Sequence, residues 1–542
     1  MTSDSATNQE SGGLGQEPSN TTQLLPEKEK EVLTETGKDD NSEQARAEAD
    51  PESVSAQSKI ASGVAPTLIC PTMTRHHFIA TRLEIFAILG ALFYVVISFS
   101  WAEPIREPAL QLVSLFVLAQ IFGVLVKFVH LPPLLGMLLA GILLKQIDYF
   151  HAEGIFLKFT ATVRSCAMTM ILLRAGLGLN PLVLCRLSTV VLRVAVFPCS
   201  VEAVTVAVVS HYLLDLPWQW GFLLGFILSA VSPAVLVPSL LTLQSNGYGE
   251  NKGIATLVIA ASSLDNIYAI TIFGIFLSAI FSQGSIMELV VQGPLEVLIG
   301  IIWGILIGVI SIYIPHSDEK SVIKLRTIMV CASGLLAVLG SQLVGYAGAG
   351  PLGCIVGAFV AGCGWRAFSS TSTYEPVMLH LTEYWLLLQP FLFGLIGTEI
   401  DISSLGGNSL QVAGLSAAVI TIGVVVRMLA CCISVQGCGL NFQETLFVGL
   451  SWLPKATVQA AIGPVALDLA RSIAFNQEQN IHLAEKVLMI AVLSVILTAP
   501  IGAIGILGAG PLLLTRSKTE ESIIEKKSED EDHPDAELQE VL

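Results

Sequence analysis

The sequence predicts an all-α polytopic membrane protein of about fourteen transmembrane helices, and composition and hydropathy both point to it. Of its 542 residues, 53% are hydrophobic and only 13% are charged, and the mean hydropathy is +0.70. A soluble domain cannot hide that much apolar surface. Apolar runs recur from Leu83 to about Gly508, and a helix of roughly 20 apolar residues crosses the hydrocarbon core. Membrane lipid is therefore an expected partner, and nucleic acid is not.

The individual spans follow from the positions of these apolar runs. Each run is read as one membrane crossing, and its first residue is uncertain by a few positions. We expect spans beginning near Leu83, Ala109, Pro132, Ala161, Thr189, Pro217, Gly253, Met287, Val322, Gly348, Glu383, Gln411, Asn441 and Ala484.

Two polar tails flank the membrane domain at 81–512. Residues 1–80 are rich in polar side chains and 513–542 carry an acidic run, so both are predicted to be disordered. The tails hold much of the acid behind the net charge of −16. Basic residues border the first and last spans, which predicts that both termini are cytoplasmic; they are Arg75, Arg82, Arg516 and Lys518. We expect the plasma membrane, with an organelle membrane as the alternative.

The ten cysteines lack the paired spacing of metal ligands. Most fall in or beside the spans, where a cysteine packs as a small apolar residue. We therefore expect no resident metal and no cofactor.

An internal repeat links the two halves of the chain. Pro133-Leu134-Leu135-Gly136 resembles Pro351-Leu352-Gly353, and Pro233 parallels Pro454 at a nearly constant offset. The apparent units, about 131–281 and 348–510, each hold five spans. Because five is odd, the second unit enters the membrane from the opposite side, which predicts the inverted repeats of many secondary transporters.

The parallel prolines predict two broken helices. Ser232-Pro233 and Pro454-Lys455 lie inside apolar spans, where a proline removes a backbone hydrogen bond and clashes with the preceding turn. Matching breaks predict discontinuous helices that cross at the bilayer midplane with their polar ends facing an ion. The alternative for each proline alone is an ordinary kink.

Asp265 is the strongest candidate for an ion-binding residue. It lies in an apolar run from about Gly253 to Phe281, and an ionisable group at bilayer depth indicates a function. Its carboxylate binds a hard cation when ionised and a proton when neutral, so one residue can couple opposite fluxes of a cation and a proton. Ser262, Ser263, Asn266 and Thr271 offer neutral oxygens nearby. The alternative is a structural aspartate with a buried partner.

Further charges lie in the spans. Glu202 and Arg427 occupy almost equivalent positions in the two repeats, which predicts an ion pair that ties the halves together. Lys455, at the second break, is expected to offset a helix C-terminus or to replace a cation when Asp265 is protonated.

Several sequence strings resemble the animal NHA subfamily of sodium/proton antiporters. They include LGMLLAG at 135–141, RAGLGL, LPWQWGF, AVSPAV, QPFLFGLIGTEI and WLPKATVQAAIGPVALD. The resemblance covers nearly the whole span region. It implies the inverted-repeat antiporter fold with two crossing broken helices, a homodimer, and a mobile core domain that exchanges Na⁺ or Li⁺ for H⁺.

The same resemblance assigns roles to individual residues. Asp265 matches the first acid of the family's ion-binding Asp-Asp pair, Glu202 and Arg427 match its inter-span ion pair, and Lys455 matches its broken-helix lysine. The second acid of the pair is replaced by Asn266. An asparagine oxygen can coordinate a cation, but the side chain cannot exchange a proton.

These observations leave two main functional hypotheses, neither of them an enzyme. The first is a secondary-active antiporter that alternates access to Asp265. The second, motivated by Asn266, is a transport-deficient relative that serves as a regulatory or partner subunit. An intramembrane aspartyl protease needs two facing aspartates at depth, and a sodium-coupled solute carrier does not explain motif matches over most of the chain.

Overall fold

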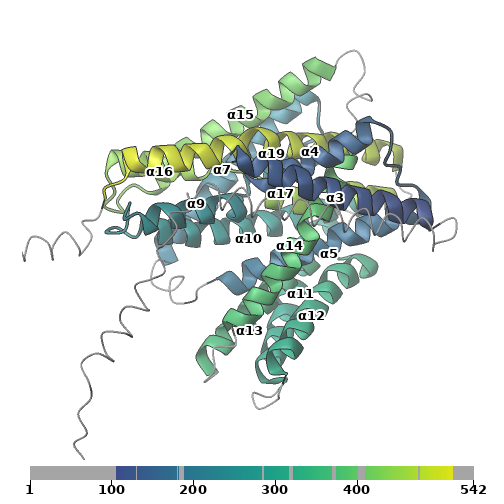
Figure 1. Ribbon diagram of the computed structural model, residues 1–542, viewed down its shortest axis with the longest axis horizontal. Helices are drawn as coiled ribbons and strands as arrows, with labels where there is room; N and C mark the ends of the chain where they lie inside the picture. The colour runs from purple at the N-terminus through teal and green to yellow at the C-terminus, as the bar shows by residue number, and fades with distance from the viewer. Residues whose placement is uncertain are drawn as a thin grey trace, which may run out of the picture. The chain divides into compact units, whose positions relative to one another are not determined.

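The protein is described here from a computed structural model. It covers residues 105–129, 131–179, 181, 188–282, 286–315, 321–368, 374–400, 409–473 and 477–516. Every regular element in these ranges is an α-helix (Figure 1), which confirms the predicted fold class. The predicted tails up to residue 80 and beyond residue 516, and the predicted first span near Leu83, lie outside the described residues.

Each predicted span from Ala109 onward corresponds to a helix or to a broken helix. The unbroken ones are α3 (Arg106–Phe128), α4 (Pro133–Gln146), α5 (Gly154–Gly178), α7 (Ser188–Leu214), α10 (Ile254–Phe281), α11 (Ile286–Tyr313), α12 (Val322–Val344), α13 (Ala349–Phe368), α14 (Tyr374–Thr398), α15 (Ser409–Ser434) and α19 (Gln477–Leu513).

Three helices begin several residues before their predicted starts. The helices α5, α14 and α19 were expected from Ala161, Glu383 and Ala484 but begin at Gly154, Tyr374 and Gln477. Their N-terminal ends carry charged residues such as Lys158, Glu375 and Glu478, which a hydropathy run does not include. Ten stretches in the described chain, one of them broken, are long and apolar enough to cross a bilayer.

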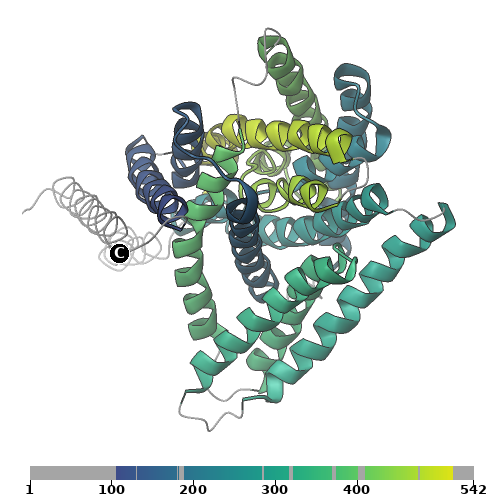
Figure 2. The same ribbon diagram turned by 90° about the vertical axis from the view of Figure 1, so that its right-hand side faces the viewer.

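The helices α11, α12 and α13 lie together on one side of the bundle in both views (Figures 1 and 2). Glycines let α11 and α13 pack closely, because a Cβ atom at Gly304 would lie 2.6 Å from Val356 Cβ and one at Gly308 would lie 2.6 Å from Val360 Cβ. Small residues at this spacing are typical of tight helix contacts in membranes. The pair α11–α13 is therefore a closely packed unit against which other helices lie.

Two broken helices cross in the other part of the bundle. The first consists of α8 (Trp218–Ser229) and α9 (Pro233–Ser245), and the second of α16 (Phe442–Ser451), α17 (Thr457–Ile462) and α18 (Val465–Ser472). Pro233 occupies the start of α9 and Pro454 lies in the gap before α17, positions where the missing N–H is tolerated.

Hydrogen bonds join the two breaks. The Ser232 amide donates to the Pro454 carbonyl at 2.9 Å, and the hydroxyls of Ser232 and Thr457 lie 3.2 Å apart. The predicted crossing of two broken helices is confirmed. The repeat boundaries, about 131–281 and 348–510, stay a prediction.

Candidate ion-binding site

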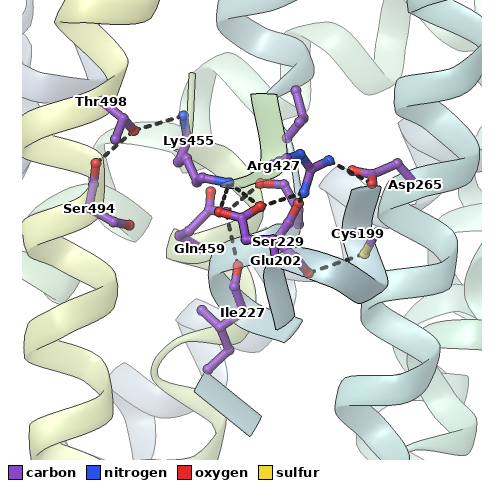
Figure 3. Close-up of polar contacts among 12 residues, drawn as sticks. Cys199, Glu202, Ile227, Ser229, Asp265, Arg427, Lys455, Gln459, Ser494 and Thr498 are labelled. Atoms are coloured by element: carbon purple, nitrogen blue, oxygen red, sulfur yellow. Dashed lines mark hydrogen bonds and ion pairs between the residues drawn. The ribbon is translucent and has the colours of Figure 1, made fainter. Parts of the chain in front are cut away.

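Four charged side chains meet beside the crossing (Figure 3). Glu202 comes from α7, Asp265 from α10, Arg427 from α15, and Lys455 from the gap between α16 and α17. Each is no more than 1% exposed. All four were candidates from the sequence, and the fold brings them together from four different parts of the chain.

The four form a continuous chain of ion pairs. Arg427 Nη1 donates to Glu202 Oε2 at 2.7 Å, and Arg427 Nη2 donates to Asp265 Oδ1 at 2.7 Å. Lys455 Nζ lies 2.8 Å from Glu202 Oε1. The sequence predicted a pair of two residues, Glu202 and Arg427. The structure has a chain of four, in which Arg427 is shared by both acids.

Only one oxygen of Asp265 is engaged. Its Oδ1 accepts from Arg427, whereas its Oδ2 is buried without a hydrogen-bond partner in the described part of the chain. A buried polar oxygen without a partner carries a free-energy penalty that a bound proton or cation would remove. Of the two roles predicted for Asp265, the Arg427 contact fits a structural one and the free Oδ2 fits an ion-binding one.

Asn266 holds the first helix break. Its side-chain Oδ1 accepts a hydrogen bond of 3.0 Å from the Val231 amide, in the extended segment that separates α8 from α9. The amide oxygen that was expected to coordinate a cation is thus used to fix the backbone. An aspartate here would accept the same hydrogen bond and could also carry a proton.

The free carbonyls at the end of α8 are satisfied by side chains from other helices. Arg427 Nη1 donates to the carbonyl of Ser229. Gln459 Nε2 donates to the carbonyls of Ile227 at 2.9 Å and Ala230 at 2.6 Å. Lys455, expected either to offset a helix C-terminus or to replace a cation, has its ammonium against Glu202.

Gln459 is a site residue that the sequence analysis missed. It was part of the motif WLPKATVQAAIGPVALD but received no role. Its position in the sequence could have indicated this role. A long amide side chain five residues after Pro454 can reach the carbonyls that a break in the facing helix leaves without donors.

The hydroxyls near Asp265 point to their own helix. Ser262 and Ser263 donate to the Ile259 carbonyl, and Thr271 donates to the Ile267 carbonyl. Such bonds to the preceding turn leave the hydroxyl lone pairs available. These hydroxyls therefore share a helix with Asp265, but within the described residues none of them bonds its carboxylate.

A second cluster of charges, buried or half-buried, lies at α18. Arg164 on α5 donates to Glu399 at 3.1 Å and to Asp468 Oδ2 at 3.2 Å, and also pairs with Asp468 Oδ1. Arg471 Nη2 lies 2.9 Å from Glu399 Oε2. The cluster joins α5 and the end of α14 to the second broken helix.

Glu399 follows the last residue of α14, outside the candidate span. Burial opposes its ionisation, but the charges of Arg164 and Arg471 outweigh that effect and lower the pKa of Glu399 below its usual value. The ionised carboxylate therefore stabilises the folded protein. A search of the sequence for charges inside spans, applied to Arg164, would have indicated this cluster.

Comparisons with known proteins show what this chain is similar to. Residues 112–508 match the family described as sodium/hydrogen exchanger, transmembrane. The human sodium/hydrogen exchanger 9B2 is 43% identical over 457 residues, covering 83% of each chain. The human sodium/hydrogen exchanger 9B1 is 41% identical over 442 residues, covering 79% of this chain and 83% of that protein.

A solved structure shares the fold. The sodium proton antiporter MjNhaP1 from Methanocaldococcus jannaschii aligns with a TM-score of 0.60 and 18% sequence identity. The alignment covers 74% of this chain and 97% of that one. At this identity the likeness supports the architecture alone.

Proposed function

Because the chain belongs to the sodium/hydrogen exchanger family, we propose that it exchanges sodium or lithium for protons, with Asp265 as the residue that binds both. The family match confirms the resemblance derived from the sequence motifs. The chain is a multi-pass membrane protein, and its relatives are named as exchangers rather than as enzymes. Secondary-active exchange needs no cofactor, since the cation and the proton are its only cargo.

One observation carries the proposal: Asp265 is fully buried and its Oδ2 has no hydrogen-bond partner among the described residues. A proton forms a neutral acid at this oxygen, and an alkali cation coordinates it as a hard ligand. Both cannot occupy it at once. Each cargo therefore displaces the other, and access that alternates between the two membrane faces converts this competition into antiport.

The charge balance of the four residues favours one-for-one exchange. Glu202 and Asp265 carry two negative charges, and Arg427 and Lys455 carry two positive ones, so the fully ionised set is neutral. Binding either a proton or a monovalent cation adds the same single positive charge. The proton-loaded site and the cation-loaded site therefore carry the same net charge. The membrane potential does not favour one of them over the other.

Arg427 controls how readily Asp265 binds its cargo. Its guanidinium already neutralises one carboxylate oxygen at 2.7 Å, so an incoming cation must compete with it. Glu202 offers Arg427 a second acceptor at the same distance. We infer that, when cargo binds to Asp265, Arg427 gives up its hydrogen bond to Asp265 and keeps the one to Glu202. The buried guanidinium charge then still has a partner.

A second function is favoured by a specific pair of observations. Asn266 cannot carry a proton, and Asp265 contacts a basic side chain that would have to yield to a cation. A chain locked in this state would move no ions and would act as a partner or regulatory subunit of an active antiporter.

We also propose the cellular arrangement that the sequence suggested. The protein would lie in the plasma membrane, or in an organelle membrane, with both termini in the cytoplasm. It would form a homodimer in which the helices carrying the site move against a static part of the fold.

Proton flux in proteoliposomes separates the two functions. A sodium or lithium jump should drive proton movement with the natural protein and not with Asp265→Asn. Asp215→Asn is a matched control, because Asp215 is an exposed acid between α7 and α8 with a positive φ that asparagine tolerates. If the natural protein moves no protons but Asn266→Asp does, the partner-subunit function is supported instead.

A further inference from the structure

A second acid is buried in the membrane domain away from the four-charge site. Glu296 lies on α11, within a candidate span, and is 1% exposed. Its Oε2 accepts from the Ser278 hydroxyl at 2.7 Å and from the Gly348 amide at 2.8 Å, and its Oε1 accepts from Gln292 Nε2 at 3.1 Å. Three helices meet at this carboxylate, since Ser278 belongs to α10 and Gly348 precedes α13.

All of these contacts are with neutral groups. No described charged side chain contacts Glu296, in contrast to Glu202 and Asp265, which both pair with Arg427. The side chain of Glu288 lies outside the described residues. The other ionisable side chains on the helices packed here are Asp265 and Tyr268 on α10, Tyr313 on α11, Lys324, Arg326 and Cys331 on α12, Tyr346 before α13, and Cys354, Cys363 and Arg366 on α13.

Glycines shape the junction around Glu296. A Cβ atom at Gly348 would lie 2.5 Å from Glu296 Oε2, and one at Gly274 would lie 2.9 Å from Gly348 Cα. A Cβ atom at Gly293 would lie 2.7 Å from Ile275 Cγ2. Any larger residue at Gly348 would push the carboxylate away from the backbone amide. The junction is thus built so that α10, α11 and the start of α13 meet at one acid.

We propose that Glu296 is a second proton-binding site, separate from Asp265, which fastens α10 to α13 when ionised and loosens that contact when protonated. The ligand of this site is a proton. Protonation would weaken the contact between α10, which carries Asp265, and the closely packed α11–α13 pair. The proposal does not depend on the exchange proposed at Asp265.

The physical basis is a close balance between two effects. An ionised carboxylate without a basic partner is strongly disfavoured in a membrane interior. Three hydrogen-bond donors aimed at its oxygens favour the same ionised form. When these effects nearly cancel, a modest change in pH decides which form is present. Protonation converts one acceptor oxygen to a donor, so Ser278 and the Gly348 amide lose a shared acceptor.

Infrared difference spectroscopy of the full protein in lipid nanodiscs tests this directly. Between pH 8 and pH 5 the natural protein should gain a carbonyl band of a protonated carboxyl group that persists in Asp265→Asn and is absent in Glu296→Gln. A spectrum of Glu296→Gln identical to that of the natural protein would overturn the proposal. Because the readout needs no transport, it remains decisive even if no exchange occurs at Asp265.

A second variant guards against misfolding of Glu296→Gln. Ser278→Ala removes one donor to the ionised form, so the carboxyl band should appear at a pH higher by about one unit. Ser311→Ala on α11 is the matched control, since within the described residues that buried hydroxyl bonds the Ile307 carbonyl alone, and it should leave the band in place. Equal midpoints for Ser278→Ala and the natural protein would contradict the proposal.

Discussion

Replacing Arg427 by glutamine tests the electrostatic reasoning most severely. The variant Arg427→Gln removes the charge shared by Asp265 and Glu202, each at 2.7 Å. Glu202 keeps Lys455 at 2.8 Å, whereas Asp265 loses the only ion pair that it makes in the described part of the chain. The four-residue site changes from neutral to a net charge of −1 when fully ionised. Both proton and cation binding at Asp265 should therefore become more favourable.

The size of the effect follows from the strength of one close ion pair. Unit charges about 4 Å apart interact with about 4 kcal/mol at an effective dielectric constant of 20. One pH unit corresponds to about 1.4 kcal/mol, which makes about three units an upper limit. Measured effects of an opposite charge at this range are about one to three units. We expect the pH of half-maximal exchange to rise by that amount.

The assay is sodium-driven proton flux in proteoliposomes, recorded from pH 5.5 to pH 9. Arg427→Lys is the matched control, because it keeps the charge while losing the two-pronged geometry, and it should shift the profile less. Adding Glu202→Gln to Arg427→Gln restores a neutral set, with Lys455 as the only base. The double variant should shift less than the single one. An unchanged profile for Arg427→Gln, or a shift to lower pH, would refute the reasoning.

Three further predictions concern the four-charge site, the first helix break and the second charge cluster. Asn266→Asp should preserve the hydrogen bond from the Val231 amide and add a second titratable acid. Proton flux should therefore increase and become sensitive to the membrane potential. If clamping the potential with potassium and valinomycin leaves the proton flux of this variant unchanged, the prediction is contradicted. Gln459→Leu leaves the carbonyls of Ile227 and Ala230 without their donor. Thermal unfolding in detergent should show that the free energy of unfolding falls by about 1–3 kcal/mol. The control Gln477→Leu replaces an exposed glutamine and should change it little. Glu399→Gln should lower the free energy of unfolding by roughly 1–3 kcal/mol at pH 7. Because the pKa of Glu399 lies below its usual value, the natural protein loses this contribution as the pH falls through that lowered pKa. Plotted against pH, the melting temperatures of the variant and the natural protein should therefore converge at low pH. Parallel curves at every pH would count against an ionised Glu399.

The sequence was sufficient for the architecture because a bilayer allows few solutions. In the described part of the chain, each apolar run of adequate length is a helix or a broken helix. A proline alone does not break a helix, since Pro198, Pro294 and Pro390 lie inside continuous ones, but two prolines at matching positions of the repeats marked the breaks. Pro233 and Pro454 therefore located both breaks. Helix starts were less predictable, as at Gly154 and Tyr374, because a helix continues through charged first turns that lie outside the hydrocarbon.

The site was only partly predictable. Buried charges are rare enough in membranes that Glu202, Asp265 and Arg427 could be chosen individually. Their pairing could not, since it depends on how α7, α10 and α15 approach one another and on which acceptor each base can reach. The contacts of two side-chain amides, Gln459 as a donor and Asn266 as an acceptor, could not be predicted. A neutral amide in a helix gives no signal until the backbone group that it bonds is known.

The most direct test of the central claim is uptake of radiolabelled sodium into proteoliposomes loaded at low pH, compared between the natural protein and Asp265→Asn. An outward proton gradient should drive sodium inward with the natural protein, and the single amide substitution should abolish that uptake. Undiminished uptake by Asp265→Asn would show that another group carries the cargo. No uptake by the correctly folded natural protein would show that Asp265 does not exchange ions in this chain.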